Sequence, residues 1–309
     1  MPRGARSRHL GLDLGATNVK WAVLEHSGDE WSVLERGQFP TSASDGADTV
    51  IQRMATQAQR AREAWPDLAT VGVGVPGLFD APEGVATFLP NLPPDWERRP
   101  VAGPMRARLG LEVRLINDAR AFGLAELRLG AGRGCDTMVG LALGTGVGGV
   151  VVVGGEVHFG HEGTGGELGH QTLLPDGPPC TCGNRGCLEA FAKADAVAGA
   201  CGTATAEEAV AAAHAGDERA LAGLAEIGRW LGIAISNLIV ILTPDRVVLG
   251  GGVSGAGALM LEPIRAEVRR RVHVTDLDTV EIVIAELGTW AGAIGAGVHG
   301  AAVHGVVPA

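Results

Sequence analysis

The sequence predicts an α/β protein built from two similar domains, and three observations support this class. A chain of 309 residues is about twice the usual domain length of roughly 150 residues, so two sizeable cores fit. Short β-rich runs alternate with helical stretches, which is the pattern of sheets flanked by helices. A strand, a Gly/Thr turn and a second strand occur twice, at Leu12–Leu24 and at Leu141–Val153. The repeat indicates two matching domains whose turns face each other across a cleft.

The first half is expected to begin with a meander of strands and to continue with helices and strands in alternation. Apolar and β-branched runs between turn residues predict the strands. Strands are expected at Leu10–Leu14, Val19–Leu24, Trp31–Gln38, Ala69–Val75 and Glu112–Ile116, and helices at 47–64 and 119–129. Residues 80–100 are rich in proline and are expected to form a loop.

The second half repeats the opening and then becomes mainly helical. Glycines interrupt the apolar stretch Val139–Gly155, so it predicts strand, turn and strand rather than a membrane-spanning helix. Helices are expected at 206–215, 217–242 and 259–271, strands at 246–249 and 280–285, and a terminal helix from Trp290. The N-terminal arginines precede a strand-like run broken by Asp13, not the apolar core of a signal peptide. We therefore expect a cytoplasmic protein without a membrane partner.

Composition and charge exclude several classes of protein. The chain has 48 glycines, roughly twice the average share. These glycines have no collagen-like period and occur beside 46% hydrophobic residues, so a collagen-like or disordered chain is excluded. A formal net charge of −10 argues against a nucleic-acid partner, because nucleic-acid-binding surfaces are usually basic. It does not argue against a nucleotide, which needs only a local phosphate site.

Three glycine-rich turns are candidate phosphate sites. Such turns present backbone N–H groups with little side chain in the way, which suits phosphate oxygens. The turns lie at Asp13–Lys20, Gly144–Gly149 and Gly250–Gly255, and none continues into the Gly-Lys-Ser/Thr of a Walker loop. A plain hairpin turn explains any single one about equally well. Three of them, two in register with the internal repeat, favour phosphate binding.

Two acidic positions lie where predicted strands end. A carboxylate inside an apolar strand is costly unless something pairs with it, so Asp13 either bonds the backbone of its own turn or binds Mg²⁺. Asp118 follows Asn117 at a strand-to-helix junction, where both residues are favoured N-caps. A carboxylate there can also act as a general base toward a bound hydroxyl. The residues alone leave both alternatives open at each position.

The most specific pattern is a cluster of one histidine and three cysteines within residues 165–189. The candidate ligands are His170, Cys180, Cys182 and Cys187, at a spacing typical of a closed tetrahedral zinc site. Four protein ligands leave no open position, so this zinc would be structural. Cysteines that are merely buried in a core would not explain the glycines between them. A disulfide is disfavoured because such bonds are rare in cytoplasmic proteins. Glu167 and Glu189 flank the cluster and could bind a polyhydroxylated ligand, although either alone is more commonly a surface charge. Cys135 and Cys201 are expected in the core.

Together these motifs resemble those of the ROK family of bacterial sugar kinases (repressors, open reading frames and kinases), and most of all its zinc-containing glucokinases. The resemblance extends from Leu10 to about Gly300. It is carried by the segments Asp13–Asn18, Leu143–Gly149, Glu167–Glu189 and Val248–Ser254. It implies an actin-like ATPase fold, duplicated in two α/β domains, with ATP and hexose in the interdomain cleft. The implied domains are a smaller one at 1–117, completed by the C-terminal helix at about 290–309, and a larger one at 118–289.

The resemblance also assigns roles to single residues. Asp118 takes the position of the general base, Asp13 that of the Mg²⁺ ligand, and His170 shares its ring between zinc and sugar. The implied sugar-binding positions are Gly77, Asn91, Asn117, Asp118, Glu167, His170 and Glu189. The implied ATP and phosphate positions are Asp13, Gly15, Thr17, Asn18, Lys20, Gly144, Thr145, Gly146, Gly250, Gly251 and Gly252. Arg120 and the segment 162–164 depart from the family pattern, so substrate preference transfers less securely than reaction type.

The implied function is an ATP-dependent hexose kinase of carbohydrate metabolism, most of all a glucokinase acting at the entry to glycolysis. The alternatives are kinases for N-acetylmannosamine, N-acetylglucosamine, fructose, mannose or allose. A sugar-responsive repressor is disfavoured because no helix-turn-helix domain fits ahead of the first phosphate motif. A non-catalytic sensor is disfavoured because Asp118 and the glycines are present, and polyphosphate-using relatives generally lack the cysteine cluster. A homodimer or homotetramer is expected by analogy.

Overall fold

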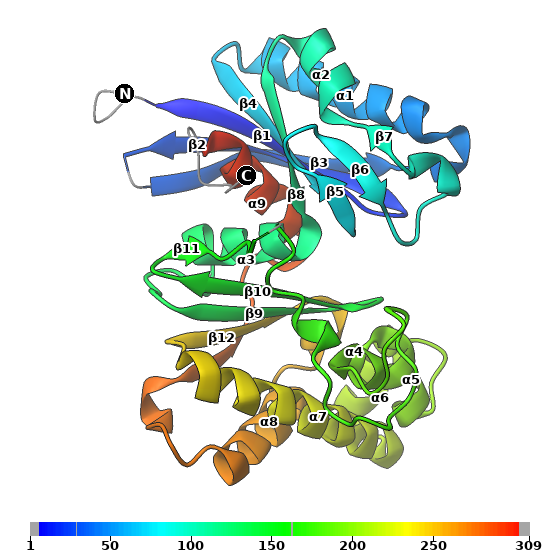
Figure 1. Cartoon of the computed structure of the whole chain (residues 1–309), viewed down its shortest axis with the longest axis vertical. Coiled ribbons are helices and arrows are strands. Elements are labelled where there is room, and N and C mark those ends of the chain that lie inside the picture. Colours follow the sequence, from blue (N-terminus) through cyan, green and yellow to red (C-terminus); the bar gives the residue numbers. More distant parts are fainter. Residues whose placement is uncertain (1–5, 29, 162, 303–309) are drawn as a thin grey trace. The chain divides into compact units, whose positions relative to one another are not determined.

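Each of the two units of the chain is built on a five-stranded sheet (Figure 1). The computed structural model describes residues 6–28, 30–161 and 163–302. Unit 1 comprises the described parts of Met1–Leu129, Phe159–Thr164 and Thr289–Ala309, and unit 2 comprises Gly130–His158 and Gly165–Gly288. In both sheets, three antiparallel strands are followed by two parallel ones. The internal repeat of the sequence is therefore a repeat of the structure.

The sheet of unit 1 has the order β3-β2-β1-β4-β8. Its strands are β1 (Ser7–Leu14), β2 (Asn18–Ser27), β3 (Glu30–Pro40), β4 (Leu68–Val75) and β8 (Glu112–Asn117). The helices of this unit are α1 (Ala47–Ala64), α2 (Ala102–Leu109), α3 (Asp118–Leu129) and α9 (Ala291–Ala301). The predicted strands and helices of the first half are confirmed with small shifts at their ends, whereas α2 lies in a segment for which no helix is predicted.

The two faces of this sheet carry different helices because β1 and β4 alternate large side chains with glycine. Leu10 and Leu12 of β1 enter the hydrophobic core that also contains the buried residues of α1 and α2. Between them, Gly11 lies so close to the backbone of Ala293 in α9 that no side chain would fit. Gly72 of β4 meets α9 in the same way. The Ala/Gly-rich terminal helix is thus packed directly on the sheet, as its small residues predict.

The proline-rich segment is not the plain loop that its composition predicts. It contains a small sheet of β5 (Leu78–Asp80), β6 (Val85–Phe88) and β7 (Arg99–Pro100). Pro100 lies on an outer strand of this sheet, where the missing N–H group is tolerated. Trp96 is buried in the core of unit 1 and fixes the segment there. The helix α2 follows directly, with Gly103 and Pro104 in its first turn.

The sheet of unit 2 has the order β11-β10-β9-β12-β13. Its strands are β9 (Met138–Leu143), β10 (Val147–Val153), β11 (Glu156–Val157), β12 (Arg246–Gly250) and β13 (Glu281–Ile284). Its helices are α4 (Leu188–Ala192), α5 (Ala194–Cys201), α6 (Ala206–His214), α7 (Glu218–Leu242) and α8 (Ala258–Arg271). The side chains of Thr205 and Asp217 cap α6 and α7, as their residue types favour. Cys135 and Cys201 are buried, as predicted.

The long helix α7 is the central helix of unit 2. Among the described residues it is the one helix long and apolar enough to cross a membrane, judged by length and composition. More than half of its apolar window is buried, however, and Leu224, Leu231 and Ile235 share one hydrophobic core with β9 and β12. This burial is the ordinary condition of a core helix in a folded unit.

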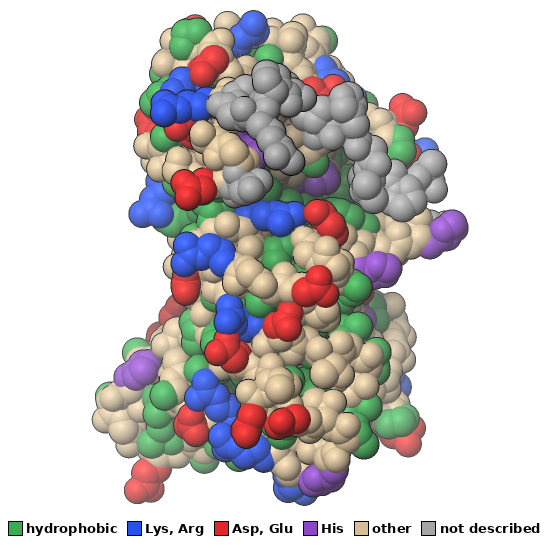
Figure 2. Space-filling view, turned by 90° about the vertical axis from the view of Figure 1, so that its left-hand side faces the viewer, with side chains coloured by type: hydrophobic (Ala, Val, Ile, Leu, Met, Phe, Trp, Pro, Cys, Tyr) green, Lys and Arg blue, Asp and Glu red, His purple; other side chains and the backbone are tan. Residues whose placement is uncertain are grey.

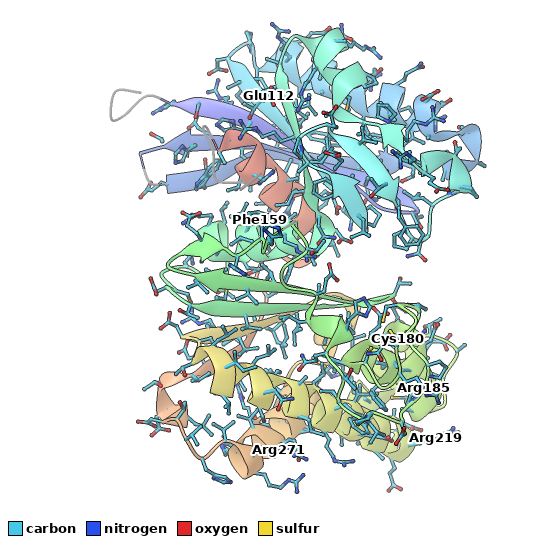
Figure 3. All side chains as sticks on the ribbon, viewed as in Figure 1. Glu112, Phe159, Cys180, Arg185, Arg219 and Arg271 are labelled. Atoms are coloured by element: carbon cyan, nitrogen blue, oxygen red, sulfur yellow. The ribbon has the colours of Figure 1, made fainter. Side chains whose placement is uncertain are left out.

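The first unit extends beyond the boundary that we predicted at 117/118. Helix α3 belongs to unit 1 because Gly295 of α9 packs directly against the backbone of Ala121. The ring of Phe159 (Figure 3) also belongs to this unit, and its centroid lies 5.9 Å from that of His299. The two units are therefore nearly equal in length rather than smaller and larger. Residues 303–309 of the predicted terminal helix, and Glu162, lie outside the described residues.

Charged side chains of both signs are interspersed on the face that Figure 2 shows. Exposed pairs of this kind occur in unit 2, where Arg265 lies 2.8 Å from Glu262. Single exposed pairs contribute little to stability.

Candidate active site and metal centre

The candidate residues of unit 1 gather at the carboxyl ends of three neighbouring strands. Asp13 on β1 pairs in register with Gly74 on β4. The next residue of β4, Val75, pairs with Asn117 at the end of β8. Asp118 then begins α3. In α/β proteins, ligands bind beyond the carboxyl ends of parallel strands, so the topology agrees with a functional role for these acidic residues.

The Asp13 carboxylate lies in a confined space on the α9 face of the sheet. A Cβ atom on Gly292, near the start of α9, would lie 2.5 Å from its Oδ2, so a side chain there would require the carboxylate or α9 to move. Among the residues that the structure describes, none donates a hydrogen bond to this carboxylate. Burial and the negative charge of Asp118 raise the pKa of Asp13 to about 7, while Lys20 opposes the shift. This environment suits a cation ligand better than a residue that bonds its own turn.

A buried threonine outside the motif holds the first glycine turn. The turn is closed by the N–H group of Gly15, which donates to the carbonyl oxygen of Asn18 at 3.1 Å. The N–H group of Thr41 donates to the carbonyl oxygen of Thr17 at 2.9 Å. Its hydroxyl group donates to the carbonyl oxygen of Gly15 at 2.6 Å. Thr41 is fully buried, and its two hydrogen bonds to carbonyl groups of the turn fix the shape of the turn.

Asn117 and Asp118 form the junction between β8 and α3. The Oδ1 atom of Asn117 accepts hydrogen bonds from the N–H group of Ala119 at 3.0 Å and from the guanidinium of Arg120 at 2.8 Å. Its Nδ2 group donates to the carbonyl oxygen of Gly77 at 3.2 Å. The Oδ1 atom of Asp118 accepts from the N–H group of Ala119 at 2.8 Å. Both side chains thus bond the first turn of α3, and Asn117 also ties it to the loop after β4.

Gly77 and Asn91 both have left-handed backbone conformations. Gly77 has φ of 85°, and a side chain there would overlap the carbonyl group of Phe88. Asn91 has φ of 68° in an exposed loop before the short helix Pro94–Trp96, and asparagine tolerates this conformation better than most residues. The structure places Gly77 against Asn117, whereas a sugar-binding role for Asn91 stays a prediction.

In unit 2, Glu189 supports the second glycine turn. Its Oε2 atom accepts a hydrogen bond from the N–H group of Val147 at 3.0 Å. A Cβ atom on Gly146 would lie 2.6 Å from the same oxygen, so the turn approaches the carboxylate closely because it lacks a side chain. The Oε1 atom accepts from the hydroxyl group of Thr181 at 3.1 Å. Glu189, which is predicted to bind the sugar, therefore also supports the second glycine turn, which is predicted to bind phosphate.

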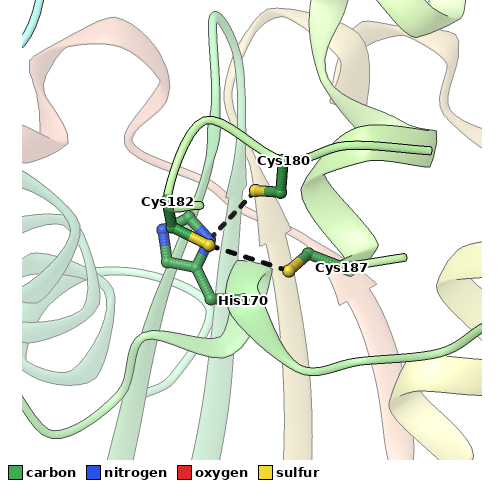
Figure 4. Close-up of side chains that lie close together, drawn as sticks. All are labelled: His170, Cys180, Cys182 and Cys187. Carbon is green, nitrogen blue, oxygen red and sulfur yellow. Dashed lines mark hydrogen bonds between the residues drawn. The ribbon is translucent and has the colours of Figure 1, made fainter. Parts of the chain in front are cut away.

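The histidine and the three cysteines predicted from their spacing come together (Figure 4). One ligand atom from each of the four side chains lies within 4.8 Å of the others. The Sγ atom of Cys180 is 3.6 Å from Nδ1 of His170, and the Sγ atoms of Cys182 and Cys187 are 3.8 Å apart. An imidazole with three thiols is a donor set that binds zinc in a tetrahedron. The residues present therefore fit this metal.

Glycine allows the tight turn that brings the cysteines together. The N–H group of Cys180 donates to the carbonyl oxygen of Asn184 at 2.8 Å, and Gly183 between them has φ of 91°. Gly186 has φ of 67° and packs against the carbonyl group of Leu174, where no side chain would fit. The left-handed backbone at Gly183 and Gly186, together with the close approach at Gly186, explains why glycine occupies these two positions.

The three thiols cannot all ionise side by side without a cation among them. Burial, followed by the hydrogen bonds that the Cys187 thiol makes as donor to the other two sulfur atoms, raises the pKa of Cys187 to about 12. A bound metal cation would reverse this effect because it favours the thiolate form. The Sγ atom of Cys180 also lies 3.7 Å from Oε1 of Glu189, so the cluster is connected to the side chain that supports the second turn.

The third glycine turn adjoins the second one. Gly251, with φ of 86°, packs on the backbone of Leu143, which directly precedes the second turn. The hydroxyl group of Ser254 donates to the carbonyl oxygen of Gly251 at 2.7 Å and closes the third turn. Glu167 lies exposed just before the short helix Leu168–His170. Its role toward a sugar stays a prediction.

The predicted residues thus form two sets, one on each unit. The set of unit 1 is Asp13, Gly15, Thr17, Asn18, Lys20, Gly77, Asn91, Asn117 and Asp118, and the set of unit 2 is Gly144, Thr145, Gly146, Glu167, His170, Glu189, Gly250, Gly251 and Gly252. Sequence reasoning missed the supporting residues Thr41 and Gly292. A glycine at the start of a predicted helix was a usable signal for Gly292, but a lone threonine gives none.

Comparisons with known proteins agree with this architecture. A model of the ROK family matches residues 9–299. The chain is 36% identical to a glucokinase of Thermotoga maritima, over 93% of this chain and 95% of that protein. A ROK family glucokinase from Streptomyces griseus, solved in complex with glucose and AMPPNP, has a TM-score of 0.78 and 29% identity, covering 95% of this chain and 99% of that one. A ROK hexokinase from Thermus thermophilus has a TM-score of 0.80 and 34% identity, covering 95% and 97%.

The duplicated sheets and their paired glycine turns define the actin-like ATPase fold of sugar kinases. Within this class, the chain belongs to the ROK family. Its cluster of one histidine and three cysteines could hold a metal ion.

Proposed function

We propose that this protein is an ATP-dependent hexose kinase with glucose as its main substrate. The observation that carries the proposal is the Asp118 carboxylate at the carboxyl edge of the unit 1 sheet, next to Asn117 and within electrostatic reach of Asp13. Further support for the proposal comes from relatives named glucokinase, which match over almost the whole chain. Glucose and an ATP analogue are the ligands of the Streptomyces griseus relative, and we carry both substrate classes to this chain.

In the proposed reaction, Asp118 takes the proton from a sugar hydroxyl, in the first place O6, as that oxygen attacks the γ-phosphorus of ATP. The bond from the γ-phosphorus to the bridging oxygen breaks in line, and ADP leaves. Asn117 orients the sugar through the amide that Arg120 and Gly77 hold in place. A positioned base of this kind contributes about 10²–10⁴-fold to the rate.

The ATP phosphates would be bound by the glycine turns and by Asp13. Amide groups of the turns at 15–17 and 144–146 would donate to phosphate oxygens. Asp13 would hold Mg²⁺ or its waters, and Lys20 adds a positive charge opposite it in the β1–β2 register. Mg²⁺ at this position would neutralise the negative charge that develops on the transferring group.

We further propose that zinc binds His170, Cys180, Cys182 and Cys187 and has a structural role. Its closed coordination leaves no position for substrate, so the metal fixes the loop. His170 and Glu189 on this loop, together with Glu167, would then bind the sugar hydroxyl groups. One ring nitrogen of His170 would bind zinc and the other would contact the sugar, so the metal would be coupled to sugar binding through this ring.

A coupled assay of ADP release across a hexose panel tests the proposal. The panel contains glucose, N-acetylglucosamine, N-acetylmannosamine, fructose, mannose and allose, and glucose is expected to give the highest kcat/KM. Asp118→Asn is expected to lower kcat at least 10²-fold, on the order of the contribution of a general base, with zinc content unchanged. Asp48→Asn, an exposed aspartate in the first turn of α1, is the matched control and should retain full activity. Near-normal turnover by Asp118→Asn would contradict the assignment.

The same assay separates the alternatives. Sugar binding without ADP release in the presence of any hexose would indicate a non-catalytic sensor. Turnover with polyphosphate in place of ATP would identify polyphosphate as a phosphoryl donor. We expect the reaction in the cytoplasm, where ATP is available, and a homodimer or homotetramer by family analogy. Light scattering after gel filtration measures the assembly.

A further inference from the structure

A cavity of about 350 Å³ lies in unit 1 where β3 ends beside α1. Its lining includes Phe39, Pro40, Ser42, Arg53, Thr56 and Arg60. Phe39 packs against the core on the α1 face of the sheet, whereas the Asp13 carboxylate contacts α9 on the other face. The cavity is therefore separated by the sheet from the proposed Mg²⁺ ligand. The proposed kinase reaction uses none of the lining residues.

Two arginines give this cavity a positive charge in a chain whose net charge is −10. Arg60 is exposed, and within the described part of the chain its guanidinium has no hydrogen bond or ion pair. Arg53 pairs with Asp45, and its Nη1 group donates to the carbonyl oxygen of Thr41 at 3.2 Å. One guanidinium is thus entirely available to a ligand and the other is only partly neutralised.

The size and the walls of the cavity limit the kind of anion. Pockets of about 300–1,000 Å³ hold small metabolites. Guanidinium groups bind phosphate oxygens with paired, charge-assisted hydrogen bonds. Phe39 and Pro40 add an apolar wall, which a free phosphate ion would leave uncovered. We propose that this cavity is a second, regulatory site that binds a small phosphate monoester such as a hexose phosphate. The choice of a hexose phosphate rests on the proposed function, but the anion site does not.

A chain of hydrogen bonds connects the cavity to the first phosphate turn. Arg53 donates to the carbonyl oxygen of Thr41, and Thr41 in turn donates to carbonyl oxygens of both Gly15 and Thr17. The neighbouring Ser42 has φ of 48°, a left-handed conformation in which a serine is strained. A ligand that draws Arg53 away from Thr41 loosens the support of the turn. Occupancy of the cavity therefore raises the KM for ATP.

Calorimetry with the active site blocked tests the binding. Glucose and AMPPNP are added at saturation, and glucose 6-phosphate is then titrated into the wild type. We expect one further equivalent to bind, and inorganic phosphate to bind more weakly because it does not contact Phe39 and Pro40. Arg60→Glu is expected to weaken the titrated binding at least tenfold. Arg269→Glu is the matched control, because Arg269 is an exposed arginine that lines a different cavity, and it should bind like the wild type.

The kinetic arm measures the coupling separately from the binding. Arg60→Glu is expected to keep the basal kcat and KM, but to lose the rise in the KM for ATP that the ester causes in the wild type. Arg53→Gln is expected to raise the KM for ATP even without the ester, because it removes the donor to Thr41. No binding by the wild type at millimolar ester, or equal binding by Arg60→Glu, would overturn the proposal. The calorimetry needs no turnover, so a failed hexose assay and a failed second site remain distinguishable.

Discussion

The guanidinium of Arg120 donates a hydrogen bond to Oδ1 of Asn117 at 2.8 Å, directly beside the proposed base Asp118. Arg120 is only 2% exposed, and a buried charge is costly unless its hydrogen bonds are made. The bond fixes the amide of Asn117, whose Nδ2 group then donates to Gly77. This buried arginine therefore orients the side chain next to the proposed base.

Replacing this arginine by lysine should impair turnover more than ATP binding. Arg120→Lys keeps the charge but loses the planar fork that reaches Asn117. We expect kcat to fall about tenfold, which corresponds to about 1.4 kcal/mol, while the KM for ATP stays within about twofold. Steady-state kinetics measure both values. Arg128→Lys, in the last turn of the same helix, is the control, and an equal loss in both variants would count against a positioning role.

Loss of one cysteine of the cluster should impair sugar binding through the metal. Cys187→Ser removes a buried ligand, and we expect a clear loss of bound zinc and at least a tenfold higher Kd for glucose. Cys201→Ser changes an equally buried cysteine outside the cluster and should retain the zinc. Elemental analysis and glucose titration measure the two effects. Normal glucose affinity in a zinc-free Cys187→Ser protein would refute the link between metal and sugar.

A methyl group at position 292 should disturb the Asp13 carboxylate. In Gly292→Ala the new Cβ atom would lie 2.5 Å from Oδ2, so the carboxylate or α9 must move. We expect a higher requirement for Mg²⁺ in the kinase assay and a lower melting temperature. Gly199→Ala, where the new methyl group meets no neighbour within 4 Å, should instead stabilise α5 by about 0.5–1 kcal/mol. Equal behaviour of the two variants would contradict the close approach of Gly292 to Asp13.

The stability of the protein without Mg²⁺ and nucleotide should depend on the ionisation of Asp13. Its pKa is raised from 3.8 to about 7, so its ionised form is less favourable in the native state than in the unfolded chain. The cost begins as pH rises above 3.8 and reaches its full size above pH 7. Asp13→Asn removes it, and we expect a gain in unfolding free energy of about 4 kcal/mol at pH 8 and of only about 1.5 kcal/mol at pH 5. Urea unfolding at both pH values measures this, and a larger gain at pH 5 would show the opposite sign.

The sheets could be predicted because their strands carry local signals. The runs of apolar residues on β1, β4 and β9 and the turns between them define each strand without knowledge of its neighbours. The cluster around Cys180 could be predicted because its ligands lie close together in the sequence. Helix α2 could not be predicted, because Gly103 and Pro104 at its start usually indicate a turn. Proline is also tolerated in the first turn of a helix, so the same residues fit both structures.

The missed features depend on contacts between distant segments. Thr41 supports a turn that lies more than twenty residues before it, and nothing in its own neighbourhood indicates this. The boundary of unit 1 depends on the packing of Gly295 against Ala121 at the far end of the chain. The raised pKa of Asp13 depends first on its burial and then on Asp118, which begins α3 just after β8, two places from β1 in the sheet. Such relationships become visible only when the chain is folded.

The position of α9 also has a consequence for synthesis on the ribosome. The strands of unit 1 emerge early, but the helix that covers Gly11 and Gly72 emerges after the whole of unit 2. At about 5–20 residues per second, the growing chain keeps that face of the first sheet uncovered for roughly ten to thirty seconds. Unit 2 can therefore complete its core before α9 has been synthesised and packed on the sheet of unit 1.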